Sequence, residues 1–424
     1  MLIINIPANA NEKANEKITI EECYQMAREN YPLLKQYNLI NLSESYNLRM
    51  ASHAYIPQFA INGKATYQNE VLKFPFEIPE AFGTIPDFSK DQYQVALEMT
   101  QIVWDGGITS SKRKSTKAQA QSSREEFEVD MYALKGRVNN IYLGILLIQE
   151  QIYLNNILIE QLKDNADRVK KCIENGVANS SDLDMIDVEI ISANQRKVEM
   201  QTMQKAYCEM LSIMIAKKLE PSSLIKPNPG QKTPSQLLAE VEMANIKRPE
   251  LKLFDAKKNE LKVQEDMLYT YVMPRLGLFV KGMYGRPGFN MMSDDFAWNA
   301  VGGLTLSWNF GGLYNLLSGK RLLETNTKKI DVMRDTFLFN TKLQTRSQMA
   351  ESEKYIKLMK EDDKIISLRE RIRKSVESAM ENGAKNASDL IQELTKEQIA
   401  RQQKVIHEIE LIKSIYELKN IKNN

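Results

Sequence analysis

The chain is built from two copies of one unit. ARENYPLL near its start aligns with ANIKRPEL near its middle, and a second proline follows at the same interval in each copy, in YIPQF and VMPRL. The stretch VWDGG in the first copy corresponds to NFGG in the second, and ENGVANSSDL corresponds to ENGAKNASDL. Four landmarks in the same order predict an internal duplication. We place the two copies at residues 18–219 and 235–420.

Three further segments flank or join the copies. Residues 220–234, EPSSLIKPNPGQKTP, are rich in proline, lack periodicity and are interpreted as a linker. Residues 421–424 form a short tail. The first 17 residues begin MLIINIPANANEK, which lacks the charged start and the full apolar run of a secretory signal. We therefore expect residues 1–17 to be the remnant of a removed signal or a truncated start.

Each copy contains a very long helical pattern. From Met131 onward, apolar residues follow one another at spacings of three and four, and Asn155 is the one polar exception in the seam. The seam consists of Leu134, Val138, Ile141, Ile145, Ile148, Ile152, Ile159, Leu162, Ala166, Val169 and Ile173. Such a heptad pattern predicts a coiled coil. A helix from the WDGG stretch to the next turn would be roughly 100 Å long at ~1.5 Å per residue, which no compact domain requires.

Two stretches in each copy alternate between apolar and polar residues. They predict strands at about 56–68 and 91–105 in the first copy, and at about 274–285 and 296–310 in the second. The stretches have aromatic residues near their ends and are long enough for membrane-spanning β-strands, which need about ten residues. A half-buried sheet of a soluble protein would show the same alternation, so the strands alone do not decide between the two.

Composition argues against several classes of function. Charged residues make up 26% of the chain but leave a net charge of only +2, which offers little attraction to nucleic acid. The three cysteines lie far apart and the two histidines stand alone, so neither a zinc site nor a histidine-based catalytic group is indicated. No phosphate-binding loop, nucleophile elbow or dinucleotide signature occurs. We expect no enzymatic activity, no catalytic residue, no cofactor, no metal and no nucleic-acid partner.

The predicted elements suggest how several chains would assemble. Four strands are too few to close a membrane barrel, since the smallest have about eight, and open sheet edges are not tolerated in lipid. If the strands lie in a membrane, several chains must share one barrel, and three chains would supply twelve strands. The long helices would then form a tube below the barrel. A soluble periplasmic coiled-coil adaptor or scaffold remains the alternative interpretation at this point.

The duplicated landmarks, and above all the paired NG…SDL stretches, resemble the TolC-like outer-membrane efflux proteins. The resemblance covers residues 18–420. It implies a mainly helical homotrimer with a shared 12-stranded β-barrel in the outer membrane of Gram-negative bacteria, in contact with its lipid, and an α-helical barrel in the periplasm. It further implies an exit duct of a tripartite efflux pump or a type I secretion system. Its partners would be a periplasmic adaptor and an inner-membrane transporter of the RND or ABC type.

The resemblance also assigns a gate to the hairpin tips, at about 175–183 and 382–390. Asp389 occupies the position of an acidic residue that lines the closed entrance of the family, whereas the second acidic position is Gln392 here. Lys385 and Asp182 occupy positions that link the two hairpins in the closed state. From the residues themselves, Asp182 would equally serve as the N-cap of the returning helix. We expect these four residues to form the constriction.

The same tips are expected to dock the adaptor. Their small residues would allow a partner's helical hairpin to approach closely, and a glycine in each would end the long helix in a left-handed conformation. The predicted docking residues are Gly176, Val177, Ser181 and Leu183 in the first tip, and Gly383, Ala384, Ser388 and Leu390 in the second.

Overall fold

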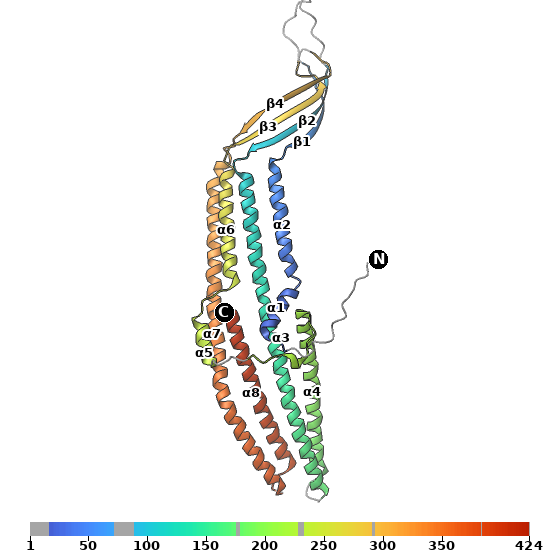
Figure 1. Ribbon diagram of the computed structural model, residues 1–424, viewed down its shortest axis with the longest axis vertical. Helices are drawn as coiled ribbons and strands as arrows, with labels where there is room; N and C mark the ends of the chain where they lie inside the picture. The colour runs from blue at the N-terminus through green and yellow to red at the C-terminus, as the bar shows by residue number, and fades with distance from the viewer. Residues whose placement is uncertain are drawn as a thin grey trace, which may run out of the picture. The chain divides into compact units, whose positions relative to one another are not determined.

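The computed structural model describes residues 17–71, 89–174, 179–227, 233–290, 293–382 and 384–423. The chain divides into two compact units (Figure 1), which we name the helical unit and the sheet unit. The helical unit contains residues 1–37, 125–252 and 333–424, and the sheet unit contains residues 38–124 and 253–332. Each repeat contributes to both units, because its strands lie in one unit and its hairpin lies in the other.

Four antiparallel strands form a single sheet in the order β1-β2-β3-β4. They are β1 (Gln58–Tyr67), β2 (Asp91–Trp104), β3 (Arg275–Arg286) and β4 (Ala297–Ser307). Each strand coincides with a predicted one to within three residues at either end. Since β2 and β3 come from different repeats and pair with each other, the two copies build one sheet together.

The two faces of this sheet differ in chemistry. The register places Ile61 opposite Leu97, and Leu278 opposite Leu304, so apolar side chains line up on one face. This face is open: Ile61 is 76% exposed and Leu304 is 69% exposed. The alternate positions form the other face and are mostly polar or small, among them Gln58, Asn62, Lys64, Thr66, Gln92, Gln94, Glu98, Thr100, Arg275, Lys281, Asn299, Thr305 and Ser307.

Aromatic side chains gather near both ends of the strands. At one end, the rings of Tyr284 and Trp298 have centroids 5.1 Å apart. At the other end, beyond the last residue of β4, the rings of Trp308 and Phe310 are 4.8 Å apart. Trp298 is 80% exposed. Two aromatic bands that flank an apolar surface are typical of strands that cross a membrane.

Two very long helices follow the strand pairs. They are α3 (Ile108–Glu174) with 67 residues and α7 (Gly312–Glu381) with 70 residues. Each is followed by a returning helix, α4 (Ser180–Ile215) or α8 (Ala387–Lys422). Helices α1 (Ile20–Asn30), α2 (Leu34–Ser52) and η1 (His53–Tyr55) precede the first strand pair, and η3 (Pro221–Ser223), α5 (Pro234–Met243) and α6 (Pro249–Thr270) precede the second. The predicted order of elements is confirmed in both copies.

The heptad seam of α3 lies in the core of the helical unit. Val138 and Ile145 are fully buried in a cluster with residues of α1 and α4, and Leu162 is buried in a second cluster with residues of α4 and α8. Asn155 is buried as well, and its side-chain amide donates a hydrogen bond of 2.8 Å to the carbonyl oxygen of Ala193 in α4. That bond explains a polar residue in an apolar seam, because buried polar groups need partners.

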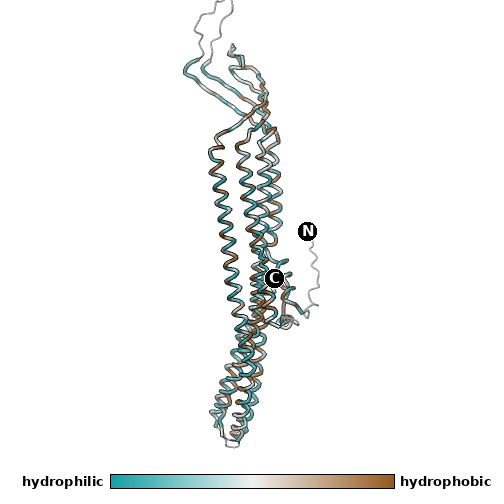
Figure 2. Tube along the Cα trace, turned by 90° about the vertical axis from the view of Figure 1, so that its left-hand side faces the viewer, coloured by the Kyte–Doolittle hydropathy of each residue, from teal (hydrophilic) through white to brown (hydrophobic). Residues whose placement is uncertain are grey.

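Figure 2 shows hydrophilic and hydrophobic residues interspersed along the helices. Among the described residues, no helix combines the length and the apolar character that crossing a membrane would require.

Candidate functional site

The first hairpin tip joins α3 to α4. Helix α3 ends at Glu174 and α4 begins at Ser180. The Asp182 carboxylate accepts a hydrogen bond of 3.1 Å from the backbone N–H of Asn179. Asp182 therefore caps the start of α4 by bonding a backbone donor that lies before it. Ser181 is exposed and Leu183 is half-buried, while Gly176 and Val177 lie outside the described residues.

The second hairpin tip joins α7 to α8 and forms a tighter set of contacts. The Asn386 side-chain oxygen accepts a hydrogen bond of 2.9 Å from the Asp389 N–H, and the Asp389 carboxylate accepts one of 3.3 Å from the Asn386 N–H. This reciprocal pair is a capping box at the start of α8. The same carboxylate lies 3.5 Å from the Lys385 ammonium. Lys385 and Asp389 thus pair within one tip.

The remaining predicted tip residues divide into surface and core. Ala384 and Gln392 are exposed and Ser388 is half-buried, while Gly383 lies outside the described residues. Leu390 differs from its predicted role as a surface residue, because it is only 2% exposed and packs in the cluster that joins the two hairpins. The physical reason is that Leu390 lies on the side of α8 that packs in this cluster, where its side chain stabilises the tip.

A ladder of ion pairs lies above the tips and joins the two hairpins. Arg168 of α3 pairs with Glu377 of α7. Arg373, one turn earlier in α7, lies 2.8 Å from Glu377 and 2.8 Å from Glu397 of α8. Arg401 of α8 completes the ladder at 2.7 Å from Glu397. The two hairpins are therefore connected through charged side chains as well as through the apolar cluster.

Glu397 is the centre of this ladder. It is 3% exposed, and an unpaired carboxylate at that depth would cost several kcal/mol. Two arginines on adjacent helices compensate for the burial, since both donate charge-assisted hydrogen bonds to it at 2.8 Å. These residues are not predicted as a site from the sequence, because Arg and Glu at helical spacing usually mark a solvated helix face.

A small cavity adjoins the ladder. It has a volume of about 170 Å³ and is lined by residues of α3, α7 and α8, including Asn165, Arg168 and Glu377. Asn165 is only 3% exposed, and its side-chain amide has no hydrogen-bond partner among the described residues. A buried amide without a partner costs about 1–3 kcal/mol, so the polar contacts at this junction between the hairpins are not all satisfied.

The junction between strand and long helix contains the DGG landmark. Asp105 is 3% exposed, and its carboxylate accepts hydrogen bonds from the N–H groups of Gly107 at 2.9 Å and Thr109 at 2.6 Å. Burial raises the pKa of Asp105, but the hydrogen bonds from Thr109, Gly107 and Tyr55 outweigh it and hold the pKa below its ordinary value. In the second copy, Asn309 accepts a hydrogen bond of 2.8 Å from Gly311 in the same way.

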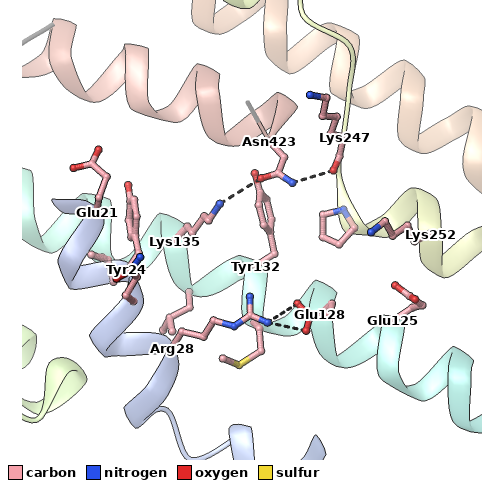
Figure 3. A pocket seen from close by; sticks show the side chains of 15 residues that line it. Glu21, Tyr24, Arg28, Glu125, Glu128, Tyr132, Lys135, Lys247, Lys252 and Asn423 are labelled. Atoms are coloured by element: carbon pink, nitrogen blue, oxygen red, sulfur yellow. Dashed lines mark hydrogen bonds and ion pairs between the residues drawn. The ribbon is translucent and has the colours of Figure 1, made fainter. Parts of the chain in front are cut away.

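A larger cavity of about 520 Å³ lies among α1, α3, the start of α6 and the end of α8 (Figure 3). Arg28 donates two hydrogen bonds to Glu128, at 2.7 and 2.9 Å, and Lys135 lies 3.3 Å from the Asn423 side-chain oxygen. Burial and the positive charge of Arg28 lower the pKa of Lys135. The contact of Lys135 with Asn423 connects the first repeat to the tail that follows the second.

Similar proteins agree with this architecture. Residues 23–212 match the family model of the outer membrane efflux proteins. No curated protein matches the sequence. Among solved structures, the CmeC outer membrane channel of Campylobacter jejuni is 13% identical, with 95% of this chain and 85% of that chain covered and a TM-score of 0.64. The open state of the Neisseria gonorrhoeae MtrE outer membrane channel is 11% identical, with 96% and 89% covered and a TM-score of 0.63.

A third structure extends the likeness. The outer membrane protein VceC from Vibrio cholerae is 10% identical, with 95% of this chain and 96% of that chain covered and a TM-score of 0.66. At such low identity these structures establish the fold, and the family match extends over residues 23–212. Residues 23–212 match the outer membrane efflux protein family, and the chain as a whole has the fold of TolC-like outer-membrane channels.

Proposed function

We propose that three copies of the chain form a homotrimeric duct through the outer membrane of a Gram-negative bacterium. The observation that carries the proposal is the two-faced sheet. Its apolar face is exposed, and β1 and β4 each have one edge without a partner strand among the described residues. Such edges are not stable in lipid, whereas three sheets joined edge to edge would close a 12-stranded β-barrel and satisfy every strand.

The helical unit supports the same assembly. In its lower part, the hairpin of α3 and α4 lies beside the hairpin of α7 and α8 (Figure 1), with α4 in contact with α8. Helices α4 and α7 both carry exposed apolar residues, including Val188 and Ile191 on α4, and Leu368 and Ile372 on α7. Val188 lies nine residues after Asn179 and Ile372 ten before Asn382, so both stand roughly 14–15 Å from a tip at ~1.5 Å per residue. Equal heights allow α4 of one copy to pack on α7 of the next.

In this assembly the chain would be the passive exit duct of a tripartite efflux pump or a type I secretion system. A periplasmic adaptor and an inner-membrane transporter of the RND or ABC type would complete the system. The alternative of a soluble periplasmic adaptor does not account for a sheet whose apolar face is open. Neisseria gonorrhoeae MtrE has been solved in an open state, which supports a duct that opens and closes.

The assembly can be tested with engineered cysteines. The pair Val188→Cys and Ile372→Cys, in a Cys172→Ser background, is expected to cross-link neighbouring copies into dimers and trimers in detergent-extracted outer membranes. The other native cysteines, Cys23 and Cys208, are buried. The matched control pairs Val188→Cys with Ile399→Cys. Ile399 is an exposed residue of α8 and lies outside the apolar surfaces of α4 and α7 that are proposed to meet. A protein that is freely soluble without detergent, or that cross-links equally in both pairs, would contradict the trimer.

We propose that the tips form the gate of this duct. Asp389 from three copies would line the closed entrance, with Lys385 and Asp182 holding the hairpins and Gln392 one turn further along α8. Within the described chain, Lys385 pairs with Asp389 and Asp182 caps α4. Arg168 and Glu377 form a charged link between the hairpins of one chain. We therefore add this pair to the gate.

The adaptor would dock at the same tips. Of the predicted docking residues, Ser181 and Ala384 are exposed, and Leu183 and Ser388 are half-buried. Leu390 is withdrawn from this surface because it is buried, and Gly176, Val177 and Gly383 remain predictions.

A bulky residue at the docking surface should block export without affecting assembly. Ala384→Trp is expected to abolish drug resistance or secretion in a complemented deletion strain, because a large ring would hold a partner helix away from the tip. The amount of SDS-resistant trimer should stay unchanged. Gln403→Trp, on an exposed position of α8 remote from the tip, serves as the control and should export normally. Normal export by Ala384→Trp would place docking elsewhere.

A further inference from the structure

The polar face of the sheet carries more positive than negative charge. Its titratable side chains are Lys64 on β1, Glu98 on β2, and Arg275 and Lys281 on β3. The assignment to this face follows from the register, because these residues alternate with the apolar positions of each strand. Three cations and one anion leave two positive charges per chain.

The register also shows which of these charges are compensated. Glu98 lies directly opposite Lys281 on the neighbouring strand, so these two charges offset each other. Lys64 lies opposite Gln94, and Arg275 lies opposite Ser307. Within the described part of the chain, none of these four side chains forms an ion pair. Lys64 and Arg275 therefore present uncompensated positive charge.

The described rim beyond the strand ends also carries Glu70, Asp294 and Asp295 against Lys90, so the cationic excess belongs to the bore between the strand ends. Arg286 at the end of β3 lies 2.6 Å from the carboxylate of Asp91 at the start of β2, so the two charges neutralise each other.

At the second hairpin tip, Asp389 is paired with Lys385, and the position three residues further is the neutral Gln392. The acidic entrance expected from the resemblance is thus weakened by a cation in each chain.

From these charges we infer that the duct selects for anions, and that anionic small molecules are the substrate class its outer bore favours. The inference rests on the proposed trimer, in which the polar faces of three sheets line the bore. Lys64 would form a ring of three cations and Arg275 a second ring, separated along the strands by the Glu98 and Lys281 pairs. Rings of Lys and Arg in a low-dielectric bore raise the local concentration of anions and favour their passage.

Reversal potentials test the inference. The full-length trimer is inserted into planar bilayers under a gradient of KCl, and the ratio of chloride to potassium permeability is measured. We expect a ratio above one for the native chain. In Lys64→Gln/Arg275→Gln the ratio should fall at least about two-fold, because both uncompensated cations are removed. Lys218→Gln, which removes a charge from the exposed segment after α4, should leave the ratio unchanged.

The outcomes separate this inference from the proposed function. A native channel that prefers potassium, or a double variant with an unchanged ratio, would overturn the anion preference while leaving the duct intact. Protein that forms no channels in any bilayer would contradict the duct itself. Both substitutions lie on exposed polar positions and introduce a neutral polar side chain, and SDS-resistant trimers in each variant verify that it has folded.

Discussion

Replacing Gly106 by alanine is expected to remove most of the assembled protein from the outer membrane. Gly106 joins β2 to α3 with a backbone φ of +69°, a left-handed conformation that costs alanine about 1 kcal/mol. A Cβ at this position would lie 2.6 Å from the Cβ of Met273 and 3.1 Å from the carbonyl oxygen of Pro274. The Met273 Cβ moves only with its backbone, so the neighbouring segment before β3 must shift as well.

Strain and steric overlap together should lower the free energy of unfolding of each chain in the trimer by about 2–3 kcal/mol or more. The yield of SDS-resistant trimer should therefore fall at least about tenfold, as measured in detergent extracts of outer membranes. Gly63→Ala is the matched control, because no atom lies within 4 Å of a Cβ at that position of β1. Equal yields for the two variants would show that the DGG turn tolerates a side chain.

The elements that the sequence predicts correctly are those whose signal is local. The seam of α3 repeats through Val138, Ile145 and Leu162, and all three residues are buried as the pattern requires. The strands alternate over ten or more residues, and the register of the sheet keeps that alternation in phase across four strands. Duplication strengthened both signals, because each element occurs twice in the same order.

The ion-pair ladder was not predictable in the same way. Arg168 and Glu377 are more than two hundred residues apart in sequence, and only the packing of the two hairpins brings them together. Arg373 with Glu377, and Glu397 with Arg401, have the i,i+4 spacing that is usual on an exposed helix face. The burial of Glu397 distinguishes the ladder from a solvated helix face. That burial depends on a neighbouring helix, which the local sequence does not reveal. Leu390 illustrates the converse, since its place beside the tip suggested a surface role that α8 packing excludes.

Releasing the ladder at Arg168 should shift the duct toward its open state. In the proposed gate, the pair of Arg168 and Glu377 holds the first hairpin against the second within each chain. Arg168→Ala removes this link and leaves Glu377 paired with Arg373. Single-channel recordings in planar bilayers should show an increase of several-fold in mean conductance or in the open fraction.

The size of the effect follows from exposure and symmetry. The Arg168 side chain is 47% exposed and that of Glu377 is 23% exposed, so solvent screens the pair and its contribution is about 0.5 kcal/mol per chain. In a trimer that opens as one unit, three links would add to roughly 1.5 kcal/mol, or about tenfold in the ratio of closed to open channels. A lone surface pair would be too weak to act as a gate, whereas three that break together are sufficient.

Lys170→Ala provides the control for this experiment. Lys170 lies 3.6 Å from Asp167 on the same helix, so its loss removes a cation and an ion pair of α3 without unlinking the hairpins. Its conductance should equal that of the native chain. If Arg168→Ala were also unchanged, the closed state would depend on other contacts of the hairpins, such as those proposed for Lys385 and Asp182. The apolar cluster that contains Leu162 and Leu390 is intact in both variants, so a difference between them isolates the charged link as the element that controls opening.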